Sequence, residues 1–254
     1  MNIIQFGKSE RVRIAASYLS ATAADRGGDL LLLPIPTTRD GVHITGCDVA
    51  LSALTDRVGK GTVAVGYAIP LSICYALSDA GATVFDAAED EDFLAENAAI
   101  TADGTVGRIL TESRRAPRDL SVGIIGYGRI GSRLLSRLMF LGARVSVIST
   151  RRSVRLSLGE SGVDCRDGDD PDRFSGLDII INTAPAPTVS EAELSDLSAN
   201  GVRVIDLASG KYLPDSPVLE KLSSVPDMMY PESAGRLYAD FALRALDGKI
   251  TSKT

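Results

Sequence analysis

Short apolar runs alternate with amphipathic stretches along most of the chain. Runs of three to six mainly apolar residues, typical of buried strands, occur at 3–6, 29–33, 62–65, 82–85, 122–125, 143–148, 163–165, 177–182 and 202–207. Stretches with apolar residues at helical intervals lie between them at 9–22, 70–80, 101–114, 191–197 and 231–246. Strands that alternate with helices predict an α/β fold with parallel sheets, because consecutive parallel strands need a crossover connection.

The pattern is interrupted near the middle of the chain. Residues 87–92 are acidic and are expected to form a turn, and Thr101 is expected to cap a helix that continues to about Arg114. Pro117 and Asp119 then separate this helix from the next apolar run. Two successive α/β units joined by a helix are therefore predicted.

The clearest functional pattern is G-x-G-x-x-G, placed where a predicted strand gives way to a helix. Gly126, Gly128 and Gly131 follow the apolar run 122–125, and leucines at helical spacing come next. In a dinucleotide site the first glycine permits a tight turn, the second lets a pyrophosphate approach, and the third allows helix and strand to pack closely. A plain glycine-rich turn is the alternative. The residues expected to hold the phosphates are Gly126, Tyr127, Gly128, Arg129, Ile130 and Gly131.

The end of the next predicted strand distinguishes between the two nicotinamide cofactors. An NAD site carries an Asp or Glu there, which binds the ribose hydroxyls. This chain has no carboxylate at that place, and its residues are Ser149, Thr150, Arg151, Arg152 and Ser153. Arginines and hydroxyls suit a 2′-phosphate, so NADP(H) is predicted over NAD(H). The alternative is a solvated pair of arginines on a loop.

Two further strand ends belong to the same edge of this predicted sheet. Ligands of parallel α/β sheets bind beyond the carboxyl ends of the strands. The turns after the runs at 177–182 and 202–207 should therefore also contact the cofactor. Their residues are Thr183, Ala184, Pro185, Leu207, Ala208 and Ser209.

Composition excludes several classes of protein. The hydrophobic fraction of 44% is that of a folded globular chain, and the net charge of −6 argues against nucleic acid or an anionic membrane as a main partner. The first residues lack the basic and long apolar segments of a signal peptide or membrane span. The three cysteines are widely spaced, as in a reduced cytoplasmic protein, and with a single histidine no metal site is predicted.

Several sequence blocks, taken in this order, resemble the A subunit of bacterial dipicolinate synthase, a family close in architecture to the D-2-hydroxyacid dehydrogenases. The blocks are Leu31–Pro34 with Thr37 and Thr38, Asn97–Thr105, Gly126–Gly131, Ile180–Pro185, Ile205–Ser209 and Pro231–Gly235. The glycine block is generic, whereas the Asn-x-x-x-Thr-x-Asp-Gly, Asn-Thr-x-Pro and Asp-Leu-Ala-Ser blocks are more specific. The resemblance extends over most of the chain.

The resemblance implies a doubly wound Rossmann domain that binds NADP and a smaller Rossmann-like N-terminal domain. It implies oxidation of a dihydrodipicolinate-type ring to dipicolinate, in spore formation, and partnership with a separate flavoprotein-like B subunit. A homo-oligomer is also expected. The expected domains are an N-terminal substrate domain at 1–98, a linking helix and break at 99–118, an NADP domain at 119–230, and a C-terminal helix packing back on the N-terminal domain at 231–254.

Two positions depart from that family. Residues 225–230 lead directly into Pro231, where the family has a Gly/Pro-rich loop, and Lys211 stands near the place where it tends to have an arginine. The shorter loop supports an alternative, a non-catalytic NADP-binding regulatory or scaffold protein. A third interpretation, a small 2-hydroxyacid dehydrogenase, is disfavoured because Glu232 stands where such an enzyme needs a histidine.

No catalytic residue is assigned from the sequence. The single histidine, His43, follows Asp40 and Gly41 in a loop of the first unit and is interpreted as a surface or core residue, with a catalytic role as the less favoured alternative. A small ring dicarboxylate needs cations and hydroxyls at the strand ends, where α/β ligands bind. The candidates are Thr37, Thr38, Arg39 and Lys211, together with Asn97 and Thr101, which either line a hinge or cap a helix.

Overall fold

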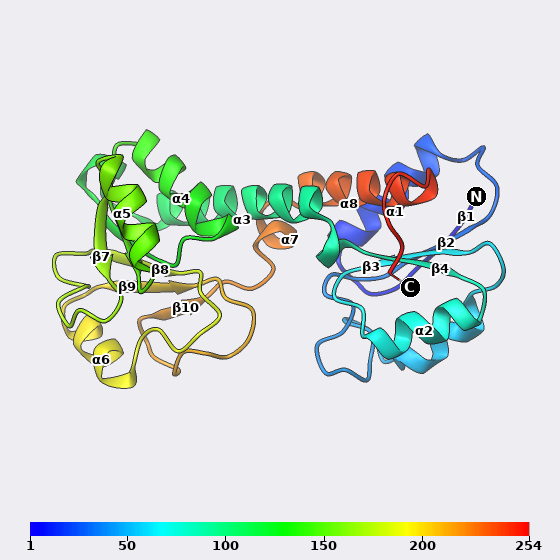
Figure 1. Ribbon diagram of the computed structural model, residues 1–254, viewed down its shortest axis with the longest axis horizontal. Coiled ribbons are helices and arrows are strands. Elements are labelled where there is room, and N and C mark those ends of the chain that lie inside the picture. Colours follow the sequence, from blue (N-terminus) through cyan, green and yellow to red (C-terminus); the bar gives the residue numbers. More distant parts are fainter. Residues whose placement is uncertain (254) are drawn as a thin grey trace. The chain divides into compact units, whose positions relative to one another are not determined.

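The computed structural model describes residues 1–253 and contains two compact units (Figure 1). Unit 1 combines Met1–Asn97 with the chain from Pro226 onward, and unit 2 comprises Ala98–Val225. Each unit is built around its own parallel sheet, with helices between the strands. The predicted α/β, Rossmann-like fold class is therefore confirmed.

Unit 1 has a four-stranded parallel sheet in the order β1-β2-β3-β4. Leu30 and Leu32 pack toward α1 and α8 on one face of this sheet, whereas Leu31 and Leu33 pack toward α2 on the other (Figure 1). A central parallel strand is covered on both faces, which explains the uninterrupted leucines. The elements are β1 (Asn2–Gln5), α1 (Glu10–Thr22), β2 (Asp29–Leu32), η1 (Leu51–Arg57), β3 (Val63–Gly66), α2 (Leu71–Asp79), β4 (Thr83–Asp86), η2 (Ala87–Glu89) and α8 (Pro231–Leu246).

The last helix of the chain supplies much of the unit 1 core. Gly235 lets α8 approach α1, because a Cβ at this position would lie 2.5 Å from Ile14 Cγ2. Tyr238 is fully buried, and its hydroxyl lies 2.7 Å from the Leu33 carbonyl oxygen and 3.1 Å from that of Val65. Burial raises the pKa of Tyr238 above its usual range, so the hydroxyl stays neutral and donates to the ends of β2 and β3.

Unit 2 has a six-stranded parallel sheet in the order β10-β9-β8-β5-β6-β7. The strand order reverses between β5 and β8, as in a doubly wound sheet, and ligands of such sheets bind at this switch point. The elements are β5 (Ser121–Ile125), α4 (Arg129–Phe140), β6 (Arg144–Ser149), α5 (Arg152–Glu160), β7 (Asp164–Asp167), β8 (Ile179–Asn182), α6 (Glu191–Ala199), β9 (Arg203–Asp206) and β10 (Leu219–Lys221).

The long helix α3 (Glu91–Glu112) begins earlier than predicted, so the helix cap expected at Thr101 is wrong. Asp90 ends the 3-10 turn η2, and its carboxylate accepts a hydrogen bond from the Phe93 N–H at 2.7 Å. The two acids after Asp90 then lie in the first helical turn, where the helix dipole favours them. The acidic run at 87–92, which was expected to form a turn, therefore also contains the first residues of α3.

Among the α-helices and strands of residues 1–253, three were not predicted. They are α5, the short edge strand β10 and the short helix α7 (Val225–Met229). β10 pairs in parallel with β9, which places Lys221 opposite Asp206. Such short elements depend on tertiary contacts more than on their own pattern. None of the helices in residues 1–253 is long and apolar enough to cross a bilayer.

Candidate dinucleotide-binding site

The glycine turn joins β5 to α4 at the switch point of the unit 2 sheet. Gly126 has a φ of +92°, which favours glycine, and a Cβ there would lie 2.8 Å from Thr183 Oγ1. A Cβ on Gly131 would lie 2.3 Å from the Gly126 carbonyl oxygen, so α4 packs directly on the turn. At Gly128, by contrast, a Cβ would meet nothing within 4 Å. The turn therefore has the bend, the close packing and the open cradle that suit a pyrophosphate.

A pocket of about 700 Å³ lies at the carboxyl edge of this sheet, a volume within the range of small-ligand sites. Five of the predicted cofactor residues line it, namely Gly126, Ser149, Thr150, Arg151 and Ala184. They lie at or just after the ends of β5, β6 and β8, which are separate in sequence and adjacent in the sheet. The other predicted cofactor residues do not line this pocket; they are Tyr127, Gly128, Arg129, Ile130, Gly131, Arg152, Thr183, Pro185, Leu207, Ala208 and Ser209.

The end of β6 carries the groups expected to select NADP. Ser149 is buried, and its hydroxyl accepts a hydrogen bond from the Arg151 N–H at 3.2 Å. The exposed Arg151 side chain donates from Nη2 to the Tyr127 carbonyl oxygen at 3.2 Å, which links this strand end to the glycine turn. Arg152 is exposed as the first residue of α5. Of the two arginines, Arg151 is the one placed at the pocket.

The loop after β7 adds a carboxylate that the sequence analysis did not include. Asp169 lines the same pocket as Arg151. A Cβ on Gly168 would lie 2.7 Å from Thr150 Cγ2, so this loop lies directly against the end of β6. The acidic run at 167–172 was visible in the sequence, but only the strand order places it beside the arginine.

Arg173 and Glu193 form an ion pair in the pocket wall. The Arg173 guanidinium lies 4.3 Å from the centroid of the Phe174 ring. Burial opposes ionisation of Glu193, but hydrogen bonds from Ser190 and Arg173 lower the pKa of this carboxyl below its usual value. Ser190 and Glu193 also form the capping box of α6. That Ser-x-x-Glu pattern was the one local signal from which these residues could have been found.

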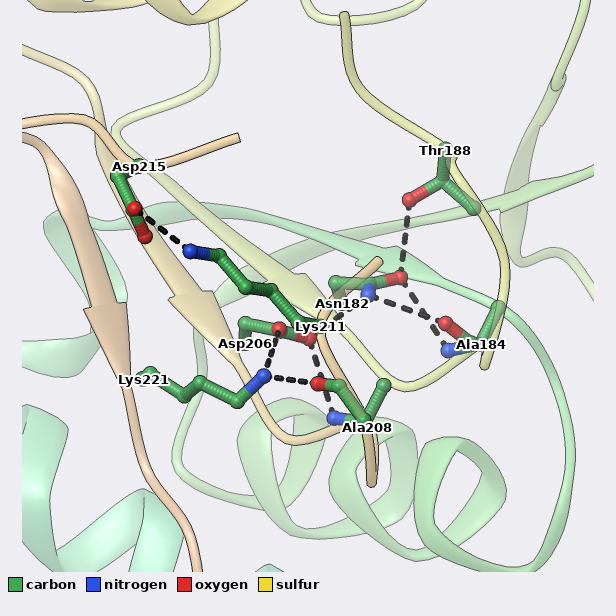
Figure 2. Close-up of polar contacts among 9 residues, drawn as sticks. Asn182, Ala184, Thr188, Asp206, Ala208, Lys211, Asp215 and Lys221 are labelled. Atoms are coloured by element: carbon green, nitrogen blue, oxygen red, sulfur yellow. Dashed lines mark hydrogen bonds and ion pairs between the residues drawn. The ribbon is translucent and has the colours of Figure 1, made fainter. Parts of the chain in front are cut away.

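A buried polar network holds the ends of β8 and β9 together (Figure 2). Asn182 and Asp206 are both buried, and Asn182 Nδ2 donates to Asp206 Oδ1 at 2.8 Å. Asn182 also donates to the Ala184 carbonyl oxygen at 3.1 Å and accepts from the Ala184 N–H and the Thr188 hydroxyl. Asp206 accepts from the Ala208 N–H at 3.1 Å. The network therefore fixes the turns after both strands, and Ala184 and Thr188 line the pocket.

The lysine that contacts this network is Lys221 (Figure 2). Its Nζ lies 3.6 Å from Asp206 Oδ2 and also donates to the Gly210 carbonyl oxygen. The predicted anchor Lys211 instead pairs with Asp215 at 2.9 Å, and its side chain is 74% exposed. The position of Lys211 after the strand end at 202–207 favoured it as an anchor, whereas strand pairing brings Lys221 to the Asp206 carboxylate.

Three of the predicted substrate residues lie in the loop after β2, namely Thr37, Thr38 and Arg39. Thr37 is fully buried, and its hydroxyl accepts from the Tyr67 N–H at 3.1 Å, which ties this loop to the one after β3. The Thr38 hydroxyl donates to Asp40 at 3.2 Å. Arg39 is exposed. Thr37 thus has a structural role, while Thr38 and Arg39 stay predicted substrate contacts.

Asn97 and Thr101 both lie inside α3, so neither residue caps this helix. Thr101 is buried, and its carbonyl oxygen accepts a hydrogen bond from the Thr105 hydroxyl at 2.8 Å. The helical interior explains their positions without any ligand. Their place at a hinge stays a prediction.

Residues 1–253 contain no group of three or more His, Cys, Asp or Glu side chains arranged to hold a metal ion. Cys47, Cys74 and Cys165 are all free thiols. Burial raises the pKa of both Cys74 and Cys165, which disfavours the thiolate form.

Known sequence families and curated protein sequences give no match to this chain. Among solved structures, the fold is similar to the A subunit of dipicolinate synthase from Bacillus halodurans, with a TM-score of 0.78 and 20% identity over 96% of this chain and 97% of that chain. The corresponding chain of dipicolinate synthase from Bacillus subtilis gives 0.76 and 19% over 98% and 96%. D-lactate dehydrogenase from Escherichia coli gives 0.59 and 14% over 100% and 99%. The resemblance in fold expected from the sequence is therefore confirmed.

Proposed function

We propose that the protein is an NADP-dependent oxidoreductase that oxidises a dihydrodipicolinate-type ring to dipicolinate. The observation that carries the proposal is the unit 2 pocket, where an open glycine cradle lies at the switch point and Arg151 with two hydroxyl residues takes the place of a carboxylate. The full-length similarity in fold to the dipicolinate synthase structures supports the choice of substrate.

In this proposal each group of pocket residues has a definite part. The N–H groups of residues 127–131 would bind the pyrophosphate, with Gly128 leaving the room that it needs, whereas the Gly126 N–H donates to the Ile148 carbonyl oxygen at 3.0 Å. Ser149, Thr150 and Arg151 would bind the 2′-phosphate. The Asn182–Asp206 network would keep the turns after β8 and β9 in place. NADP, when bound, would supply the hydride acceptor.

Calorimetric titration of both cofactors tests the first half of the proposal. Wild type should bind NADP more tightly than NAD. Loss of one charge-assisted hydrogen bond costs roughly 1.5–3 kcal/mol, so Arg151→Ala should weaken NADP binding about tenfold or more and leave NAD binding unchanged. Arg152→Ala is the matched control, because this arginine does not line the pocket. Equal affinities of wild type for the two cofactors would refute the choice of NADP.

A second variant tests the cradle itself. In Gly128→Val the added Cβ meets nothing within 4 Å, so we expect the fold to be unchanged while the branched side chain excludes the pyrophosphate. Loss of binding for both cofactors, with an unaltered melting temperature, is the expected result. If Gly128→Val bound NADP as tightly as wild type, the cofactor would not bind at this glycine turn.

Turnover tests the second half of the proposal. NADPH formation should follow addition of the freshly made product of 4-hydroxy-tetrahydrodipicolinate synthase to protein and NADP.

The competing candidate, a non-catalytic NADP-binding protein, is favoured by the direct succession of α7 and α8, which are separated by Tyr230 alone. That candidate predicts cofactor binding without turnover. A 2-hydroxyacid dehydrogenase fits less well, since Glu232 occupies the first turn of α8 and the only histidine lies in the loop after β2.

We further propose a cytoplasmic protein that self-associates and works with a flavoprotein-like B subunit. The basis is the similarity in fold to chains of dipicolinate synthase. Light scattering of the purified chain, alone and mixed with a flavoprotein encoded beside it, measures both associations. A monomer that does not respond to the flavoprotein would contradict this part.

A further inference from the structure

The Arg173 guanidinium, in the wall of the unit 2 pocket, is held by partners at its nitrogen atoms. Nη2 lies 2.5 Å from the Glu193 carboxylate and donates to the Thr188 carbonyl oxygen at 3.4 Å. Nη1 donates to the Asp170 carbonyl oxygen at 3.1 Å. The N–H bonds of a guanidinium lie in its plane, so these three partners together fix the orientation of that plane.

One face of this plane is covered by the protein itself. The guanidinium carbon lies over the Phe174 ring, 4.3 Å from its centroid. Phe174 is buried in the same hydrophobic cluster as Ile148 and Val189, which keeps the ring in place. A flat group has two faces, and with Phe174 on one of them, a ligand of the pocket can stack on Arg173 only from the other.

The charge of Arg173 makes this side chain a poor phosphate ligand. Its guanidinium already has the Glu193 carboxylate as its counter-charge, and Asp169 adds a further carboxylate to the same pocket. Arg151, by contrast, is exposed and donates to an uncharged group, the Tyr127 carbonyl oxygen. The two arginines of the pocket therefore suit different parts of a ligand, an anion at Arg151 and a neutral flat group at Arg173.

Much of the remaining pocket lining is apolar. Ile148 is buried near the end of β6. The loop after β8 contributes Ala184, Ala186, Pro187 and Val189. Aliphatic walls together with one guanidinium face suit a flat aromatic group without charge, which is the character of a nucleobase.

We propose that Arg173 recognises the adenine base of the cofactor, which stacks on the uncovered face of its guanidinium, an inference that rests on the proposed function. Guanidinium groups stack on aromatic rings and on nucleobases by cation–π attraction. The ligand itself agrees with this placement, because the base and the 2′-phosphate are attached to neighbouring carbons of one ribose. With the phosphate at Arg151, the base therefore lies in the pocket that Arg173 also lines. Glu193 is then a positioning residue, which keeps the guanidinium plane in place.

The set of ligands that respond to a substitution separates this role from a phosphate contact. A residue that binds the base should affect every ligand that contains adenine, whether NADP, NAD or adenosine 2′,5′-bisphosphate. A residue that binds the 2′-phosphate should affect only NADP and the bisphosphate, as expected for Arg151→Ala.

Calorimetric titration with these three ligands compares wild type with two variants. Arg173→Lys keeps a positive charge opposite Glu193 but lacks the flat group, so all three ligands should bind about five- to thirtyfold more weakly, the scale of a desolvated cation–π contact. Arg166→Lys is the matched control, because Arg166 donates to the carbonyl oxygens of Arg173 and Ser175 but does not line the pocket. Its affinities should match those of wild type.

Three results of this titration would overturn the proposal. They are affinities of Arg173→Lys within about twofold of wild type, a loss confined to the ligands with a 2′-phosphate, and an equal loss in Arg166→Lys. The last result would mean that the loop, and not the guanidinium face, is responsible.

A second readout uses wild type alone and so does not depend on the folding of a variant. On illumination, 2-azidoadenosine 2′,5′-bisphosphate attaches covalently to residues next to its base. We expect peptide mapping to find the label within residues 167–190, which include Arg173 and the loop after β8, and excess NADP to prevent labelling. If wild type binds NADP but the label lies elsewhere, or none lies within 167–190, the role of Arg173 fails alone. If wild type binds neither NADP nor the bisphosphate, the proposed function fails and this inference fails with it.

Discussion

Units 1 and 2 each end one strand of their sheet with a buried aspartate that holds the following turn. In unit 1, Asp86 ends β4 and accepts hydrogen bonds from the N–H groups of Ala68, Ile69 and Ala88, at 2.8 to 2.9 Å. In unit 2, Asp206 ends β9 and accepts one from the Ala208 N–H at 3.1 Å. Each carboxylate also has a lysine partner from a later part of the chain.

The two lysines differ in how completely they cover the carboxyl edge of their sheet. Lys253 belongs to the C-terminal segment; its side chain is 17% exposed, and its backbone N–H donates to the Val84 carbonyl oxygen at 2.8 Å. Lys221 comes from the neighbouring strand β10 and is 41% exposed. In unit 1 the buried aspartate is therefore covered by the segment that carries Lys253, whereas in unit 2 the buried aspartate supports turns next to a pocket. Whether the carboxyl edge of a sheet is covered or exposed therefore depends on which segment, distant in sequence, packs against it.

Removal of the carboxylate that closes the unit 1 edge should have the largest effect on stability. Asp86→Ala leaves three backbone N–H groups without their acceptor and removes the buried carboxylate that pairs with Lys253, and breaking a buried pair in this way costs about 3–5 kcal/mol. Urea unfolding measures the loss. Glu89→Ala is the control, because Glu89 contacts the same lysine from an exposed position. A loss under about 1 kcal/mol for Asp86→Ala would break the comparison between the two units.

The lysines should respond in the order of their burial. Lys253→Ala leaves Asp86 buried without its counter-charge and should cost about 1.5–3 kcal/mol, while Lys221→Ala, at a more exposed pair, should cost about 1 kcal/mol or less. Both free energies come from urea titration. If the two variants lost similar free energies of unfolding, Lys253 would stabilise the unit 1 sheet no more than Lys221 stabilises the unit 2 sheet.

The pH dependence of the Lys253 contact has a defined sign. Desolvation lowers the pKa of Lys253, but hydrogen bonds from its ammonium to Asp86 and Glu89 outweigh this and raise the pKa above its usual value. The contribution to stability is therefore complete at neutral pH and is lost as pH rises above the usual range of lysine. Urea midpoints measured from neutral to strongly alkaline pH should converge for wild type and Lys253→Ala. A gap that stays constant at high pH would contradict this origin.

A smaller effect is expected where α8 meets the unit 1 sheet. Tyr238→Phe removes the hydroxyl that donates to the ends of β2 and β3, and leaves the ring in its apolar contacts. The expected loss is about 1–1.5 kcal/mol, the usual net value of one buried hydrogen bond. Thermal unfolding followed by circular dichroism should show a lower melting temperature. An unchanged melting temperature would mean that water or packing replaces the bond.

The smallest effect concerns the open edge of unit 2 and has the opposite sign. Asp169 shares the pocket with Arg151, and its carboxylate would repel a 2′-phosphate. Asp169→Asn should therefore tighten NADP binding about two- to fivefold, the scale of an exposed charge interaction, and leave NAD binding nearly unchanged. Calorimetry gives both constants. Weaker NADP binding in this variant would instead identify Asp169 as a ribose ligand.

Elements with a strong local pattern could be predicted closely. The last helix, expected at 231–246, spans Pro231–Leu246, because its proline start and apolar spacing are both local. The run at 122–125 and the glycines after it likewise form a strand, a tight turn and a helix start. At α3 the local pattern was misleading, since an acidic run suits a turn and a first helical turn equally, and only the bond from Phe93 to Asp90 distinguishes the two.

The charges of the candidate site show the limit of such patterns. Lys211 stands close in sequence to Asp206, yet Lys221 meets that carboxylate because β10 pairs with β9. Asp169 reaches the pocket of Arg151 because β7 lies beside β6.

By itself, therefore, the sequence determined the two α/β units, their parallel sheets and the glycine turn between strand and helix, since each is encoded in residue spacing over a few turns of chain. The tertiary structure alone decided which charges share a pocket, which lysine meets each buried aspartate, and where the C-terminal segment returns. The physical reason is the parallel sheet, which gathers at one edge strand ends that lie far apart in the sequence.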